Sequence, residues 1–230
     1  MKRFLLFFIV MLTSSCVLAS DDATLAETSA IEARINSIGV KILNANKIDK
    51  RVVFVYSKKD RSKLLKGTEA LTKRQVVVYQ NDYKNIETDD ELAAYVAEQI
   101  PAAARSYQGG TGFLSSVKMK AAPKKYELVF DKLAVDYMVK AGYNPLGLIT
   151  WINKSCPQAR QDKLSHSNLT SKRLALIYER IYMKYPSFLA KNTYIQNEYY
   201  QNFLLTSQEN RKILQEKIQN KDWKRELKYE

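Results

Sequence analysis

Histidine, cysteine, glycine and proline are all scarce in this chain of 230 residues, and each scarcity excludes something. Seven Gly and five Pro are too few for a loop-rich β-sandwich and favour helices. Of the two cysteines, Cys16 lies near the N-terminus, so Cys156 has no partner for an internal disulfide and is expected to be a buried free thiol. His166 is the only imidazole, whereas a catalytic zinc takes about three protein ligands, usually with nitrogen or sulfur among them.

The first 19 residues have the anatomy of a secretory signal. A basic start, Met1–Arg3, precedes the apolar run Phe4–Leu12, which is far shorter than the roughly 20 residues that span a bilayer. Two processing sites compete. Cleavage after Ala19 would start the mature chain at Ser20, whereas a segment that resembles a lipobox would make Cys16 a lipidated N-terminus. We therefore expect an exported protein, either in the periplasm or anchored to the membrane as a lipoprotein through Cys16.

Positive charge is in excess, with a formal net charge of +13. Removing the signal takes away Lys2 and Arg3 and leaves +11 (13 − 2). This excess favours anionic surfaces such as lipid headgroups or cell-wall polymers, although it can also serve solubility alone. The Lys and Arg residues form no basic stripe with interleaved aromatics, so we expect no nucleic-acid partner.

Periodic apolar residues predict a mainly helical α+β fold with a small β-sheet. The helix at 88–100 begins with a capping box, in which Thr88 and Glu91 each satisfy a backbone N–H of the first turn. The helix at 125–141 ends at Gly142, a favoured residue just after a helix. A second capping box, Thr206 and Glu209, predicts the start of the last helix. The predicted helices are 22–45, 88–100, 125–141, 145–154, 170–184 and 206–222, and the predicted strands are 51–57 and 75–79.

Three segments, in this order, resemble a known family. The run from Glu91 to Ala103 contains Ala-Glu-Gln-Ile-Pro, and the run from Glu127 to Pro145 contains Asp131 and ends Ala-Gly-Tyr-Asn-Pro. The third segment begins at His166. Together they are similar to the HtpX, BepA and CAAX-prenyl-protease type of zinc metalloendopeptidase (peptidase family M-forty-eight). The resemblance implies a gluzincin-type metallopeptidase-like domain over residues 20–205, followed by a C-terminal helix over 206–230.

The resemblance also implies which positions held the metal in the family. Its H-E-x-x-H motif falls on residues 97–101, so the two zinc-binding His are replaced by Ala97 and Pro101. Glu98 matches the general base, and Glu127 matches the third ligand. Because Ala97 has no donor and Pro101 has neither donor nor backbone N–H, we expect no zinc and a helix that kinks or ends at Pro101.

Other family positions are also degenerate. Asp131 matches an Asp that orients a zinc-binding His, and that His is absent. His166 and Arg173 match residues near the family's substrate, but Ser167 replaces a Pro and the spacing to Arg173 is one residue longer. The resemblance therefore implies a pseudopeptidase, an envelope adaptor that binds partner proteins or unfolded polypeptide in the old cleft.

Several alternatives stay open. The chain could be a working zinc metalloendopeptidase with unconventional ligands, or an unrelated basic envelope-binding module. Glu98 could serve as a base in another reaction. Glu127 and Asp131, four residues apart on one helix, predict either an ion-paired couple with nearby Lys or a weak oxygen-rich cation site. If the family geometry persists, Glu98 and Glu127 should face one shared cleft.

Overall fold

The computed structural model describes residues 25–59, 74–105, 123–156 and 168–222. The predicted signal, Cys16 and His166 lie outside these ranges, so their roles stay predictions. Within the described ranges, no helix is both long and apolar enough to cross a bilayer.

The architecture is α+β and mostly helical, as the sequence predicts. A helix over residues 25–45 comes first and is followed by a two-stranded sheet. The strands are β1 (Val53–Ser57) and β2 (Gln75–Tyr79), and the helices after them are α3 (Gln80–Tyr83), α4 (Asp89–Arg105), α6 (Pro123–Lys140), α7 (Leu146–Ser155), α8 (Leu169–Lys184), α9 (Ser187–Ala190), α10 (Glu198–Thr206) and α11 (Gln208–Gln219).

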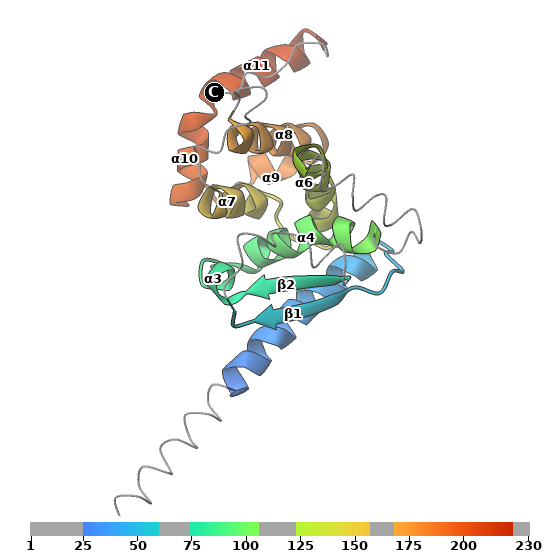
Figure 1. The fold of residues 1–230 in the computed structure, drawn as a ribbon. Coiled ribbons are helices and arrows are strands. Elements are labelled where there is room, and N and C mark those ends of the chain that lie inside the picture. Colours follow the sequence, from blue (N-terminus) through green and yellow to red (C-terminus); the bar gives the residue numbers. More distant parts are fainter. Residues whose placement is uncertain (1–24, 60–73, 106–122, 157–167, 223–230) are drawn as a thin grey trace, which may run out of the picture.

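The two strands are parallel, with Phe54 of β1 opposite Val76 of β2. Phe54 is buried, and its ring fills the space beside Gly39 of helix 25–45, where an added Cβ would lie 2.5 Å from the ring carbons. Glycine at position 39 therefore allows the helix to lie close against β1. Figure 1 shows this helix running alongside the two strands.

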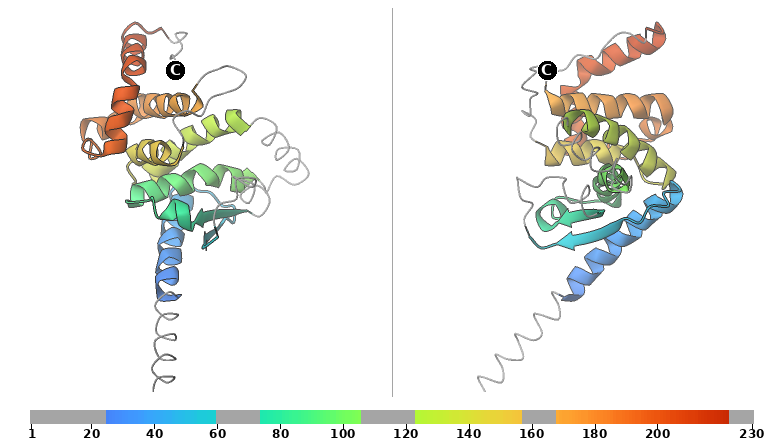
Figure 2. Two further views of the ribbon diagram at one scale, coloured as in Figure 1. Left: turned by 60° about the vertical axis from the view of Figure 1, so that its left-hand side comes forward. Right: turned by 45° about the vertical axis from the view of Figure 1, so that its right-hand side comes forward.

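Helix α4 is the centre of the molecule. It contacts β2 on one side and α6 and α7 on the other, and α8 lies beyond α6 and α7 (Figures 1 and 2). Most of α4 from Glu91 to Ala103 is buried, because a helix packed on both sides has little surface left for water. Thr88 accepts a hydrogen bond from the N–H of Glu91, as predicted. The Glu91 carboxylate, however, accepts from the N–H of Glu87.

The sequence predicts that α4 kinks or ends at Pro101. The helix does not end there, since it continues to Arg105 with Pro101 buried inside it. Proline removes one backbone hydrogen bond from the helix, but nearly every neighbouring residue of α4 is held by tertiary packing. This packing outweighs the low helix propensity of proline, because tertiary contacts commonly override the propensity of a single residue.

Two other boundaries differ from the sequence predictions. Helix α10 falls in a stretch for which no helix was predicted, and it starts at an Asn197 cap whose side chain accepts from the N–H groups of Tyr199 and Tyr200. The capping box at Thr206 is wrong, because the Thr206 hydroxyl donates back to carbonyl groups of α10. The last helix, α11, instead begins after Ser207.

Gly142 follows α6 with a φ of 77°, which supports its predicted role at the helix C-terminus. Tyr194 and Tyr200 are buried, so the tyrosine-rich stretch 194–200 contributes to packing. The Tyr194 hydroxyl also donates to Asp90 near the start of α4, which ties the segment before α10 to the central helix.

Candidate functional site

Three helices bring acidic side chains together around one guanidinium group, that of Arg173 on α8. Glu98 comes from α4, and Glu127 and Asp131 come from α6. Cys156 follows the last residue of α7. We call these five residues the Arg173 cluster. Its members are the positions at which the family resemblance places the general base, the third ligand and the orienting Asp, together with Arg173 and the thiol.

Asp131 is the closest partner of Arg173. Its Oδ2 accepts from Nε at 2.8 Å and its Oδ1 accepts from Nη2 at 2.7 Å, which is the two-point geometry that suits a planar guanidinium. The side chain of Asp131 is 1% exposed and that of Arg173 is 4% exposed. Such a pair is withdrawn from water, so each charge depends on the other for stabilisation.

The remaining guanidinium nitrogens also have partners. Nη2 contacts Oε1 of Glu98 as well as Asp131. Nη1 lies 3.2 Å from Oε1 of Glu127 and 3.4 Å from Sγ of Cys156. All three nitrogens of Arg173 are thus engaged, and the group is held by side chains from α4, α6 and the end of α7.

Negative charge is in excess at this cluster, because three carboxylates share one guanidinium. Burial and the nearby charges of Asp131 and Glu127 raise the pKa of Glu98 to about 8, against the opposing effect of Arg173. Burial likewise raises the pKa of Asp131, although the charge and hydrogen bonds of Arg173 oppose it. A carboxyl group with a pKa near 8 keeps its proton at neutral pH, so Glu98 can donate a hydrogen bond to Asp131.

Burial also raises the pKa of the Cys156 thiol, with the carboxylate of Glu98 adding to the effect and Arg173 opposing it. The neutral thiol is therefore favoured at neutral pH, and a neutral thiol is a poor nucleophile. This agrees with the sequence expectation of a largely buried free thiol, although Cys156 keeps some exposure.

Zinc does not fit these residues. Ala97 is completely buried and Pro101 is buried inside α4, and neither offers a ligand atom. The cation among Glu98, Glu127 and Asp131 is the guanidinium of Arg173. No imidazole belongs to the described part of the cluster, and the described residues contain no group of His, Cys, Asp and Glu arranged to hold a metal ion.

Sequence reasoning singled out Glu98, Glu127, Asp131 and Arg173 as site residues, but it did not predict that Arg173 is the cation that the carboxyl groups share. Arg173 was expected to lie near a substrate, and Glu127 and Asp131 were expected to pair with nearby Lys. The partner of Asp131 is instead Arg173, from a helix far along the chain, and Glu127 contacts the same guanidinium. The shared cleft expected between Glu98 and Glu127 is taken up by the same guanidinium, which both carboxylates contact.

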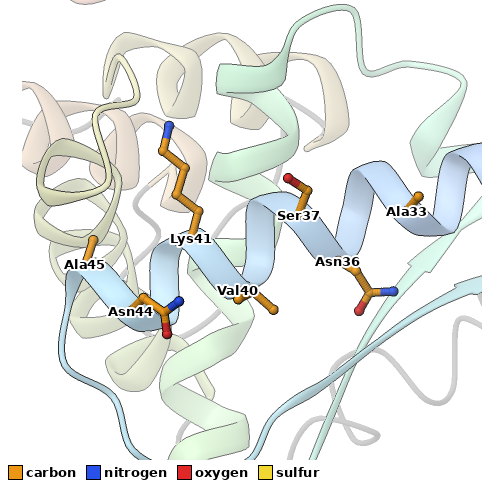
Figure 3. A pocket seen from close by; sticks show the side chains of 7 residues that line it. All are labelled: Ala33, Asn36, Ser37, Val40, Lys41, Asn44 and Ala45. Atoms are coloured by element: carbon orange, nitrogen blue, oxygen red, sulfur yellow. The ribbon is translucent and has the colours of Figure 1, made fainter.

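The large hollow drawn in Figure 3 lies elsewhere, along helix 25–45. Its lining includes Asn36, Val40 and Lys41, and the Lys41 ammonium lies 4.3 Å from the ring centre of Tyr143. None of its lining residues belongs to the Arg173 cluster. It is an open helix face with no convergent set of reactive groups.

A second ionic cluster joins the start of α4 to α7. The Lys154 ammonium lies 2.9 Å from Glu91 and 2.8 Å from Glu87. Glu91 is completely buried and Glu87 is exposed, so this group anchors α7 to the N-terminus of α4.

Comparison of the chain with family models, curated proteins and solved structures found no match to any of them.

Proposed function

We propose that this chain is an exported, catalytically inactive protein with a zinc-metallopeptidase-like fold, and that it acts by binding partner proteins or unfolded polypeptide in the bacterial envelope. The observation that carries the proposal is the Arg173 guanidinium lying among Glu98, Glu127 and Asp131. These are the carboxylates that the family resemblance assigns to a metal centre, and here an arginine is their cation.

The convergence supports the resemblance. Glu98 lies on a different helix from Glu127 and Asp131, 29 and 33 residues away along the chain (127 − 98 and 131 − 98). Asp131 is 1% exposed, and the side chains of Glu98 and Glu127 are 19% and 24% exposed. Carboxyl groups this close together repel one another when ionised, and both the nearby guanidinium and the proton of Glu98 reduce this repulsion. Such a cluster is expected where a scaffold once held a metal ion and a fixed positive charge has taken its place.

The same geometry argues against peptide hydrolysis. A zinc peptidase needs an ion that lowers the pKa of its bound water to about 7 and a carboxylate that takes the proton. Glu98 keeps its own proton at neutral pH and contacts Arg173, so it has neither the charge nor the freedom of a general base. The site therefore has a structural role, and the activity that remains to such a scaffold is binding.

The first test is metal content and proteolysis. Mature protein purified from zinc-replete medium should contain far less than one zinc per chain and should not cleave an unfolded protein substrate. Stoichiometric zinc, together with chelator-sensitive cleavage that Glu98→Gln abolishes, would show instead a working metalloendopeptidase with unconventional ligands.

A restoration series tests the role of Arg173 directly. Ala97→His with Pro101→His rebuilds the H-E-x-x-H turn, but the guanidinium still occupies the centre, so we expect no zinc binding. Adding Arg173→Ala should allow binding, since two imidazoles and Glu127 then supply about three ligands. The matched control adds Arg180→Ala instead, and it should stay metal-free. Equal zinc binding by the double variant and both triple variants would show that Arg173 does not govern the site.

Binding of polypeptide needs its own measurement. Added at equimolar amounts, the mature protein should slow the aggregation of a reduced, unfolding client protein, as followed by light scattering. Anionic and neutral lipid vesicles form the second arm. Association with anionic vesicles alone, without any effect on the client, would favour the basic envelope-binding module over the adaptor.

A further inference from the structure

Helix 25–45 packs one side against the core and turns the other side to water. The packed side includes Ile35, Ile38 and Ile42, which are buried in the hydrophobic core. Six exposed residues lie on the opposite side, and they follow one another at alternating intervals of four and three residues, which sets them in one line along a helix. We call this line the outer face, and its residues are Ala26, Ala30, Ala33, Ser37, Val40 and Asn44.

The composition of the outer face is unusual for a helix surface that meets water. Charged residues make up 27% of the chain, yet none of the six positions is charged, and Val40 is 47% exposed. The side of a helix that faces solvent ordinarily carries charged and polar residues. Figure 3 shows the C-terminal half of this face, with Lys41 along one edge and Asn36 along the other. The outer face therefore has the composition of a helix surface that packs against another element.

Charges along one edge of the outer face indicate which element fits it. Glu27 and Lys41 are both exposed and lie 14 residues apart (41 − 27), which is two heptads, so they share one edge of the helix. Arg34 lies halfway between them and is already paired with Asp89 at 2.7 Å. This edge thus has an acid at its N-terminal end and a base at its C-terminal end. A second copy of the helix that runs in the opposite direction brings Lys41 of each copy beside Glu27 of the other.

The side chains of the outer face also match in size when the second helix is reversed. Its N-terminal half has only alanine, and its C-terminal half has the larger residues. Reversal sets Ala30 opposite Val40 and Ala33 opposite Ser37, and small side chains opposite larger ones allow close packing. A parallel pair would instead set Val40 level with itself and bring like charges level with each other. We propose that the outer face binds a second copy of this chain, with the two helices antiparallel in a two-fold symmetric dimer.

The size of the outer face predicts a weak dimer. Helix 25–45 has 21 residues (45 − 25 + 1) and is about 30 Å long at about 1.5 Å per residue. One pair of helices of this length buries less than the roughly 1,600 Å² of a standard interface, so we expect a dissociation constant in the micromolar range. No residue of the outer face belongs to the Arg173 cluster, so the dimer does not depend on the proposed binding of polypeptide.

Sedimentation equilibrium of the mature protein, from about 1 μM to about 1 mM, should show a reversible equilibrium between monomer and dimer. Ser37→Arg places a long charged side chain in the middle of the outer face and should weaken the dimer at least about tenfold. Ser187→Arg is the matched control, because it is the same change at an exposed position of α9, and it should leave the dimer unchanged. Both variants should keep the wild-type melting temperature, since both side chains are exposed.

Exchange of the edge charges tests the antiparallel arrangement. In Glu27→Lys or in Lys41→Glu alone, like charges face each other at both ends of the pair, so each dimer should be about threefold to tenfold weaker than the wild-type dimer. Mixed in equal amounts, the two variants regain both opposite-charge contacts and should associate more tightly than either variant alone. The melting temperature of Lys41→Glu is measured beside its association, because this change also removes the contact with Tyr143.

Three results would overturn the proposal. A wild-type protein that stays monomeric to about 1 mM would show that the outer face does not bind a second copy, and a helix of another protein would then be its occupant. Equal association of Ser37→Arg and the wild-type protein would place the dimer contact elsewhere on the chain. No gain on mixing Glu27→Lys with Lys41→Glu would exclude the antiparallel pairing of the two edges.

Discussion

Helices α6 and α8 are joined twice by arginine and aspartate, and the two junctions differ in their balance of charge. Arg173 pairs with Asp131, and Arg180, two turns further along α8, pairs with Asp136. The first junction has two additional carboxylates, those of Glu98 and Glu127. The second has an additional cation, Lys184 at 3.9 Å, and a hydroxyl donor, Tyr185 at 2.9 Å.

The pKa values of Asp131 and Asp136 shift in opposite directions. Burial raises the pKa of Asp131 even though Arg173 opposes the shift. Burial acts in the same direction on Asp136, but hydrogen bonds from Arg180 and Tyr185, with the charge of Arg180, outweigh it and lower that pKa. At the second junction a single carboxylate pairs with Arg180, as in an ordinary structural ion pair. The Arg173 cluster has three carboxyl groups for one guanidinium, two more than such a pair requires.

The largest expected effect comes from removing the shared cation. Arg173→Ala leaves three carboxylates around an unfilled space and should lower the free energy of unfolding by about 3–5 kcal/mol, as for other broken buried pairs. Arg180→Ala, the matched control, should cost only about 0.5–1 kcal/mol, because its side chain is 27% exposed and water replaces part of the interaction. Urea unfolding at pH 7 measures both.

Similar losses in the two variants would remove the distinction between the junctions. If Arg173→Ala fails to fold, Arg173→Lys keeps the charge but loses the two-point contact with Asp131, so it should show a smaller loss in the same direction.

The helices at the centre of the fold could be predicted from the sequence, whereas the contacts between their side chains could not. Apolar periodicity and the Thr88 cap mark α4, and Gly142 marks the end of α6. Helix α10 was not predicted, because its cap, Asn197, lies inside the tyrosine-rich stretch 194–200 and not before a distinct apolar run. Local signals of this kind act within a few residues, so they identify elements better than contacts.

The candidate site shows the same limit. Motif spacing singled out Glu98, Glu127 and Asp131, but nothing near them in the chain indicates which cation they share. Arg173 lies 42 residues beyond Asp131, and only the packing of α8 on α6 brings the two together. The sequence offered one sign, the family match that places Arg173 near the same site, but that match assigns Arg173 to substrate and not to the carboxylates.

A second prediction uses the direction of the Glu98 shift. Its pKa rises from 4.5 to about 8 on folding, so the folded state holds this proton more tightly than the unfolded state. The contribution to stability is complete below about pH 4.5 and is lost as the pH rises towards 8. A shift of about 3.5 pKa units corresponds to at most about 5 kcal/mol, so the free energy of unfolding should fall by up to that amount over the interval.

Glu98→Gln should remove most of this slope, because the amide cannot lose a proton and leaves one negative charge fewer beside Asp131. Urea midpoints at several pH values from 5 to about 9 make the measurement, with Asp136→Asn as the control that keeps the slope. An unchanged slope in Glu98→Gln would show that Glu98 does not carry the proton at this cluster.

The smallest effect concerns Asp136, whose pKa moves the other way. A carboxyl with a lowered pKa stabilises the folded state above its unfolded value of 3.8 and loses this contribution as the pH falls through the lower folded value. Asp136→Asn should therefore cost about 0.5–1 kcal/mol at pH 7, and its stability should converge with that of the wild-type protein near pH 2. The Asp136 junction therefore sets the pH dependence of stability below about pH 4, and the Arg173 cluster sets it between about pH 4.5 and 8. A difference that persists undiminished at pH 2 would mean that packing of the Asp136 side chain, rather than its charge, joins α6 to α8 at this point.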